Sequence, residues 1–191
     1  MSLTATTHIH AVGIGRTGAA HIEALIRTGE IEDLLAAPGA SFAALLIDIG
    51  DDDIMVPDDY ARSLKSRLRS RGIPAERFHY ESVALTVPEA SALLELSKGA
   101  ALPKAGEHIP RAIAKATFGL NNKGVDSTVG GLLQRFANHV KTGEGPSVVL
   151  LAFGLAGGVC GQALPALFRR NDKEATGERV VCSLQYRVHC V

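Results

Sequence analysis

A glycine-rich loop that joins an apolar strand to a helix occurs twice in this sequence, and this repeated unit constrains the fold more than any other feature. The first loop, Gly13-Ile-Gly15-Arg-Thr-Gly18, follows a short β run and leads into a helical pattern. The second loop, Gly154–Gly161, follows the most convincing buried strand of the chain, Ser147–Phe153. A strand that continues into a helix in this way is typical of parallel sheets covered by helices. The sequence therefore predicts an α/β fold.

The rest of the chain alternates between strand and helix patterns in the same way. Strands are expected at residues 8–13, 42–48, 78–85, 147–153 and 180–191. Helices are expected at residues 18–27, 31–37, 58–70, 88–96, 109–118, 129–140 and 162–170. This alternation predicts a three-layer, Rossmann-like arrangement, with a mostly parallel sheet and helices on both faces. At 191 residues the chain fits a single domain, in which the segment 119–140 reads as a helical insertion.

Charge and composition narrow the range of partners. Twenty basic and twenty acidic side chains give a formal net charge of zero, so no basic surplus exists to neutralise a nucleic-acid backbone. No apolar stretch is long enough to span a bilayer, so a membrane partner is not expected. The cysteines Cys160, Cys182 and Cys190 form no CxxC pair and are typical of a reduced, cytoplasmic protein. Cys182, His189 and Cys190 also lack the spacing of zinc ligands, so no metal site is expected.

The first glycine loop has the residue types that a phosphate-binding turn needs. Gly13, Gly15 and Gly18 let the backbone turn sharply and approach a phosphate with no Cβ in the way. The helix that follows offers free N–H groups and the positive end of its dipole to an anion. Arg16 and Thr17 can add a positive charge and a hydroxyl group. The alternative is a tight strand–helix turn that binds nothing.

The second glycine loop repeats this logic after the strand Ser147–Phe153. Its glycines, Gly154, Gly157, Gly158 and Gly161, form a second candidate anion cradle. The alternative is that they only let a helix pack closely on the sheet. Loops at the carboxyl ends of parallel strands open at the same edge, so we expect the two loops to line one crevice. Gly15, Thr17, Gly157 and Gly158 are then expected within reach of one phosphate-sized anion.

Four segments, taken in order, resemble the tubulin and FtsZ family. The segment 11–22 is similar to the first phosphate loop and helix of that family, and Leu46-Ile-Asp48 lies where the family has its second strand and loop. Lys98–Gly106, leading into Arg111, is similar to the loop around the γ-phosphate. Residues 153–165 resemble the glycine-rich signature loop, including the proline that ends it. The order and spacing hold from about residue 8 to the end of the sequence, which implies a GTP- or GDP-binding domain of this type.

The sequence also departs from the family pattern. Where the signature loop carries threonines, this chain has Val159 and Gly161, and Cys160 and Gln162 replace glycines, so hydroxyls that would bind phosphate are missing. The chain further lacks the later strands, the central helix and the second domain of the family. The resemblance therefore implies a nucleotide-binding half without the acidic loop that completes hydrolysis, and no efficient hydrolysis by the chain alone is expected.

Three functions follow from these patterns. The first is a tubulin/FtsZ-like nucleotide- or phosphate-binding protein that acts in an assembly, as a homo-oligomer or as a subunit of a hetero-complex. The second is a Rossmann-type NAD(P)-binding oxidoreductase subunit, favoured by the unbroken GxGxxG and by Asp48 at the end of the second strand. The third is a structural subunit that has lost its ligand.

No catalytic residue can be assigned from the sequence. Cys160 at the start of a helix is a conceivable nucleophile, but a free cysteine without a partner base is more often a small packed residue. His21 and His108 lie near the proposed cleft, where each can meet phosphate or simply cap a helix or face solvent. The basic residues of the helix 58–70 are read as a solvated face.

Overall fold

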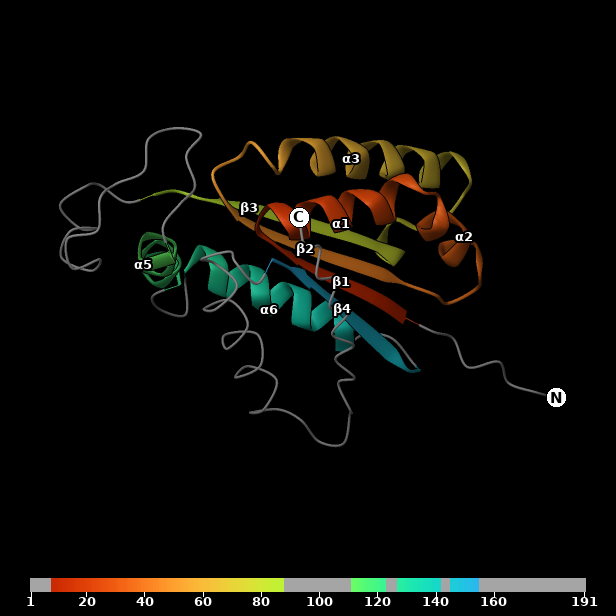
Figure 1. Cartoon of the computed structure of the whole chain (residues 1–191). Coiled ribbons are helices and arrows are strands. Elements are labelled where there is room, and N and C mark those ends of the chain that lie inside the picture. Colours follow the sequence, from red (N-terminus) through yellow and green to blue (C-terminus); the bar gives the residue numbers. More distant parts are fainter. Residues whose placement is uncertain (1–7, 88–110, 123–126, 142–144, 155–191) are drawn as a thin grey trace.

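The computed structural model describes residues 8–87, 111–122, 127–141 and 145–154, and within them it is an α/β protein (Figure 1). Its four strands form one all-parallel sheet in the order β3-β2-β1-β4. The strands are β1 His8–Ile14, β2 Phe42–Ile49, β3 Phe78–Leu85 and β4 Ser147–Phe153. The predicted α/β class, the parallel sheet and the four strand positions are confirmed, with each strand end within one residue of its expected place.

Helices cover one face of the sheet with α1 Gly15–Arg27, α2 Glu30–Ala36 and α3 Met55–Ser70. Each helix turns one apolar face toward the sheet. Ile22 and Ile26 of α1 and Leu64 and Leu68 of α3, each pair four residues apart, are buried there. They pack in one cluster with residues of β1, β2 and β3. A short 3-10 turn, Ala75–Arg77, leads from α3 into β3.

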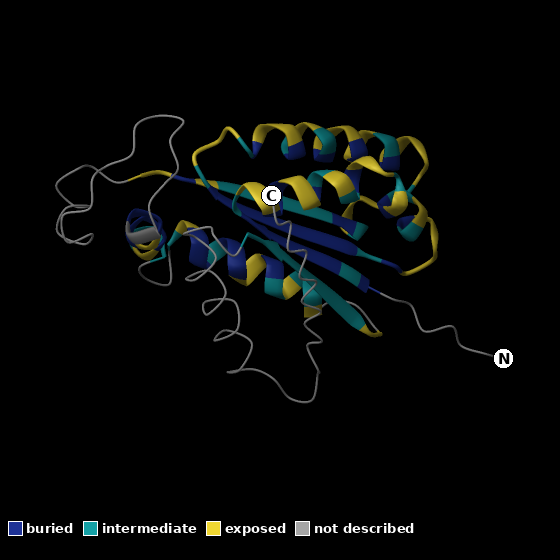
Figure 2. Ribbon diagram, viewed as in Figure 1, coloured by how far each residue is buried: buried dark blue, intermediate teal, exposed yellow. Residues whose placement is uncertain are grey.

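The opposite face is covered by α5 Arg111–Asn121 and α6 Thr128–Lys141. Leu133 and Phe136 of α6 and Phe118 of α5 pack against Val12 and Leu45 of the central strands. With both faces covered, β1 and β2 are buried along almost their whole length, as Figure 2 shows by the dark strands between helices with exposed outer sides. This burial explains why β2 reads as a nearly continuous apolar run rather than as an alternating pattern.

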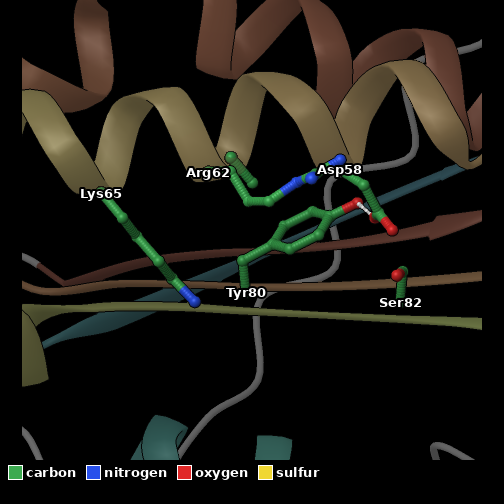
Figure 3. A pocket seen from close by; sticks show the side chains of 6 residues that line it. Asp58, Arg62, Lys65, Tyr80 and Ser82 are labelled. Carbon is green, nitrogen blue, oxygen red and sulfur yellow. Dashed lines mark hydrogen bonds between the residues drawn. The ribbon is translucent and has the colours of Figure 1, made fainter.

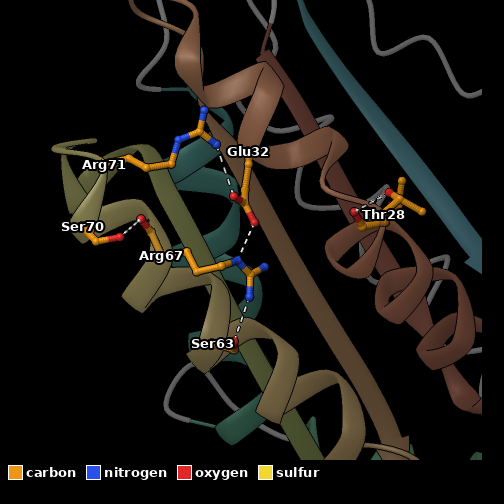
Figure 4. Close-up of polar contacts among 7 residues, drawn as sticks. Thr28, Glu32, Ser63, Arg67, Ser70 and Arg71 are labelled. Atoms are coloured by element: carbon orange, nitrogen blue, oxygen red, sulfur yellow. Dashed lines mark hydrogen bonds and ion pairs between the residues drawn. The ribbon is translucent and has the colours of Figure 1, made fainter.

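An ion-pair cluster joins α2 to α3 (Figure 4). Glu32 of α2 accepts hydrogen bonds from Arg67 Nε at 2.6 Å and from Arg71 Nη1 at 3.2 Å, at the end of α3. The Glu32 side chain is only 15 % exposed, so this carboxylate is partly shielded from water. The basic residues of α3 are largely exposed, as expected of a solvated face, but Arg67, at 43 % exposure, also contacts Glu32 of α2.

Several predicted elements lie outside the described residues. These are the helices at 88–96 and 162–170, the terminal strand at 180–191 and most of the second glycine loop. Within the part of the chain that the structure describes, no helix is long and apolar enough to cross a membrane.

Candidate functional site

Two of the three glycines in the first loop are required by packing. A Cβ on Gly13 would lie 2.8 Å from the carbonyl oxygen of Gly18. A Cβ on Gly18 would lie 2.5 Å from the carbonyl carbon of Gly13 and 2.7 Å from the carbonyl oxygen of Ala152 on β4. Because these neighbours are backbone atoms, they cannot move aside as a flexible side chain can. Gly13 and Gly18 therefore let α1 approach β1 and β4 closely.

Gly15 has a different role, because it is the residue at which β1 turns into α1. Its φ of +69° is a left-handed conformation that side chains with a Cβ rarely adopt. Among the described residues the space around it is open, since apart from its chain neighbours and its own helix backbone the only heavy atom within 4 Å of a Cβ there is Asp48 Oδ1, at 3.9 Å. Ile14 precedes the helix and provides no side-chain cap to its N–H groups. The first turn of α1 thus presents backbone N–H donors next to open space, which is the arrangement that binds anions.

Asp48 lies beside this turn, near the end of β2. The residue is buried, with 9 % of its surface exposed, and its Oδ1 accepts a hydrogen bond from the Ile49 N–H at 2.7 Å. Burial, with a smaller contribution from the nearby Asp53 carboxylate, raises the pKa of the Asp48 carboxyl group to about 6. The Ile49 N–H and the Arg16 guanidinium act in the opposite direction. A carboxylate that is held ready to ionise near neutral pH, next to open space, is well suited to accept a hydrogen bond from a ligand hydroxyl.

Arg16 and Thr17 complete the first turn of α1. Arg16 Nε lies 3.1 Å from Asp53 Oδ1, in an ion pair with the acidic turn that follows β2. The Arg16 side chain is 86 % exposed, so little holds it in this position. Thr17 faces β4, where a Cβ on Gly154 would lie 2.9 Å from Thr17 Oγ1. The start of the second glycine loop therefore lies directly against the first loop.

The strand order explains why Gly154, at the end of β4, lies against the first loop. Ile14, the last residue of β1, is paired with Phe153, the last residue of β4. The chain leaves β1 toward β2 on one side, while β4 is added on the other side. This reversal makes the carboxyl ends of β1 and β4 a topological switch point, the place where open parallel sheets bind ligands. Gly157, Gly158 and Gly161 lie outside the described residues, so their approach to a shared anion stays a prediction.

A second hollow, which the sequence did not reveal, lies between α3 and β3 (Figure 3). It has a volume of about 220 Å³ and is lined by Asp58, Ala61, Arg62, Lys65, Tyr80 and Ser82. The Tyr80 hydroxyl donates to Asp58 Oδ1 at 2.8 Å, and Arg62 pairs with Asp59 on the surface. In the sequence, only the i, i+3, i+4, i+7 spacing of Asp58, Ala61, Arg62 and Lys65 indicated that these residues share one face of α3. Because much of this polar lining is satisfied within the protein, the hollow is a weaker candidate than the switch point.

The remaining candidate residues do not add a catalytic group. His21 Nδ1 lies 2.7 Å from the Thr17 carbonyl oxygen, so this histidine interacts with its own helix. Cys160 and His108 lie outside the described residues. Among the described residues, no group of three or more His, Cys, Asp or Glu side chains is placed to hold a metal ion.

Comparisons of the chain with models of known protein families, with curated proteins and with solved structures found no match.

Proposed function

We propose that this chain binds a nucleotide at the switch point between β1 and β4, with its phosphates on the first turn of α1. The observation that carries the proposal is Gly15, which combines a φ of +69° with open space at an uncapped helix N-terminus. Gly29, at the start of α2, also combines a positive φ with open space, but Gly15 differs from it because it lies at the carboxyl end of the central strand β1, beside Asp48. Asp48, at the edge of the same space, supplies an acceptor for a ligand hydroxyl.

The ligand we favour is GTP or GDP, bound by a tubulin/FtsZ-like subunit that works in an assembly. The ordered resemblance of four segments supports this choice, and the sheet order leads the first and last of them to the same edge. Arg16 can leave its exposed ion pair with Asp53 and turn to a phosphate. Met55 and Val56 are 60 % and 48 % exposed at the start of α3, shortly after Asp53, and they support a role in association.

A second candidate function is the binding of NAD(P), and Asp48 favours it. In dinucleotide-binding proteins an acidic residue near the end of the second strand hydrogen-bonds the ribose. Each of the three loop glycines has its own role there: one allows the tight turn, one lets the backbone approach the phosphates, and one lets the helix pack closely on the strand. Gly13, Gly15 and Gly18 divide their roles in a comparable way. The long separation between Gly18 and Asp48 has a structural reason, because the extra helix α2 lies between α1 and β2.

The test is a binding series with the wild-type chain and three variants. We would measure affinities for GTP, GDP, ATP, NAD and NADP by calorimetry, together with melting temperatures. Gly15→Val should abolish nucleotide binding, because a branched side chain closes the approach to the helix N-terminus. Gly72→Val is the matched control, since Gly72 also has a positive φ of 70° and open space but follows α3, away from the site. It should lose a similar amount of stability and keep its affinity.

The variant Asp48→Ala separates the two ligand classes. Under the dinucleotide function it should weaken NAD and leave any GTP affinity nearly unchanged. Under the tubulin-like function, GTP or GDP should bind to the wild type while NAD does not. A wild-type chain that binds none of the five nucleotides, or a Gly15→Val variant that binds as well as Gly72→Val, would contradict the proposal.

A further inference from the structure

Histidines lie in a row across the sheet beneath α6. His10 of β1 and His79 of β3 both pair in register with Ala43 of β2, so the three residues share one face of the sheet. α6 covers this row with two rings. Phe136 meets His10 edge-on, with ring centroids 6.3 Å apart, and His139 stacks on His79 at 3.7 Å. The contact between α6 and the sheet thus passes through three imidazole rings.

His10 forms the buried end of this row. It is 1 % exposed, and neither of its ring nitrogens has a hydrogen-bond partner. Burial, with smaller contributions from the neighbouring His8 and His139, lowers the pKa of His10 to about 4. At neutral pH this ring is therefore an uncharged aromatic group packed against Phe136. A proton on it would place a charge among apolar side chains with no acceptor for it.

His79 and His139 form the outer end of the row. His79 Nε2 lies 3.4 Å from Glu81 Oε1 without a hydrogen bond, while the same oxygen accepts from Arg135 Nε of α6 at 2.7 Å. Burial lowers the pKa of His79, and His139, Lys65 of α3 and Arg135 lower it too. Glu81 alone acts in the opposite direction, and it is already engaged by Arg135.

We propose that these histidines make the docking of α6 on the sheet sensitive to acid, so that a fall in pH releases α6 and uncovers the apolar face beneath it. Charged rings at 3.7 Å repel each other, and the apolar contacts of Leu132, Leu133 and Phe136 would have to oppose that repulsion. The row lies toward the start of the strands, at the other end of the sheet from Gly15.

The direction of the response follows from the neutral state of the folded rings. Where the folded protein holds a histidine neutral, the unfolded or released state binds more protons below the ordinary histidine pKa of 6.5. The stabilising contribution of the neutral His10 ring is therefore complete above about pH 6.5 and is lost as the pH falls toward about 4, and His79, whose pKa is also lowered by burial, acts in the same direction. The affected element is α6, while α3, on the opposite face, has no such row.

Hydrogen exchange of the full chain at pH 7.5 and pH 5, corrected for intrinsic rates, tests the proposal. We expect amide protection in α6 to fall by roughly tenfold or more at pH 5, while protection in α3 changes by less than about threefold. Unchanged protection in α6 would overturn the proposal. An equal loss in both helices would overturn it as well, because it would indicate global unfolding.

A double variant tests whether the stacked pair is responsible. His79→Phe with His139→Phe keeps two aromatic rings in place and removes two of the three protonation sites, so the loss of α6 protection at pH 5 should become smaller, with His10 accounting for the remainder. His21→Phe is the control, because His21 is exposed on α1 and should leave the response as in the wild type. A double variant that responds like the wild type would contradict the proposal. If the double variant does not fold, the comparison of α6 with α3 in the wild type still decides.

Discussion

Gly13, Gly15 and Gly18 occupy one loop, yet each meets a different physical demand. Gly13 and Gly18 face backbone atoms at 2.5 to 2.8 Å, so any side chain there would force α1 away from the sheet. Gly15 faces open space, and what it provides is its backbone conformation. The spacing of glycines in the sequence indicated a phosphate loop but could not separate these roles. They depend on how closely α1 approaches β4, a strand that comes much later in the chain.

The buried carboxyl group of Asp48 is expected to lower the stability of the folded chain at high pH while it helps to bind a ligand. Its pKa is raised to about 6 in the folded chain, so its contribution to stability is complete below about pH 3.8 and is lost as the pH rises through 6. Asp48→Asn keeps an oxygen that accepts the Ile49 N–H but carries no charge. At pH 8 the Asn variant should therefore melt about 2 to 6 °C higher than the wild type. Differential scanning calorimetry at pH 8 and pH 4.5 checks this.

Two further observations belong to the same experiment. The difference in melting temperature should become much smaller at pH 4.5, because Asp48 is then protonated in the folded wild type, and it should approach zero below about pH 3.8. If Asp48 bonds a ligand hydroxyl, nucleotide affinity should fall in the Asn variant even though its stability rises. A variant that is less stable at pH 8 would show that the Asp48 carboxylate is not strained by burial.

Among the elements, α2 illustrates how a short helix is held in place. Seven residues are too few for a helix to be stable alone, and Ile31 and Leu35 supply its buried side. The ion pairs of Glu32 with Arg67 and Arg71 then fix its position against α3. The sequence predicted α2 from its pattern but did not indicate these contacts, since the partners are more than thirty positions apart.

Removal of the Glu32 charge should loosen this pair of helices. Glu32→Gln is expected to lower the free energy of unfolding by about 1 to 2 kcal/mol, because two charge-assisted hydrogen bonds are weakened around a partly buried group. Urea denaturation measures this loss. Glu30→Gln removes the same charge from the same turn of α2 without touching either arginine, and it should cost much less. Equal losses would indicate that the helix dipole, rather than the ion pairs, accounts for the effect.

Helix starts were the least predictable boundaries, and the reasons are local. The helix predicted to begin at residue 58 begins at Met55, because Pro57 is tolerated in a first turn, where its missing N–H costs nothing. The Met55 N–H instead bonds back to the Asp51 carbonyl oxygen. The helix expected from Gly18 begins at Gly15, where a positive φ lets strand become helix in one residue. In both cases a residue type that commonly interrupts helices is part of the helix start.

At the scale of the whole molecule, hydrophobic pattern was enough to predict the parallel sheet, and the loop motif was enough to place the candidate site on it. The sequence could not give the strand order, and therefore could not show that Thr17 meets Gly154 or that Asp48 borders Gly15. It also gave no sign of the row formed by His10 and His79, which exists only because β1, β2 and β3 align in one register.

Association is the property of the whole molecule that the exposed start of α3 predicts. We expect the chain to form oligomers at micromolar concentration, because Met55 and Val56 are largely exposed and the net charge of zero gives little repulsion. Met55→Lys with Val56→Lys should shift the mass measured by light scattering toward the monomer. Ala24→Lys with Ser66→Lys adds the same charge at other exposed positions and should not. A monomeric wild type would contradict this expectation.

The central place of β1 has a consequence for how the protein is made. β1 leaves the ribosome before β2 and β4, and β2 can pair with one edge of β1 soon afterwards. The other edge of β1 stays unpaired until β4 has been made. About a hundred residues separate the end of β2 from β4, so at common rates of translation that edge stays open for about 5 to 20 s. During this time the nascent chain presents an apolar strand that other chains can pair with. The strand that holds the proposed nucleotide site is therefore also the one most in need of protection during synthesis.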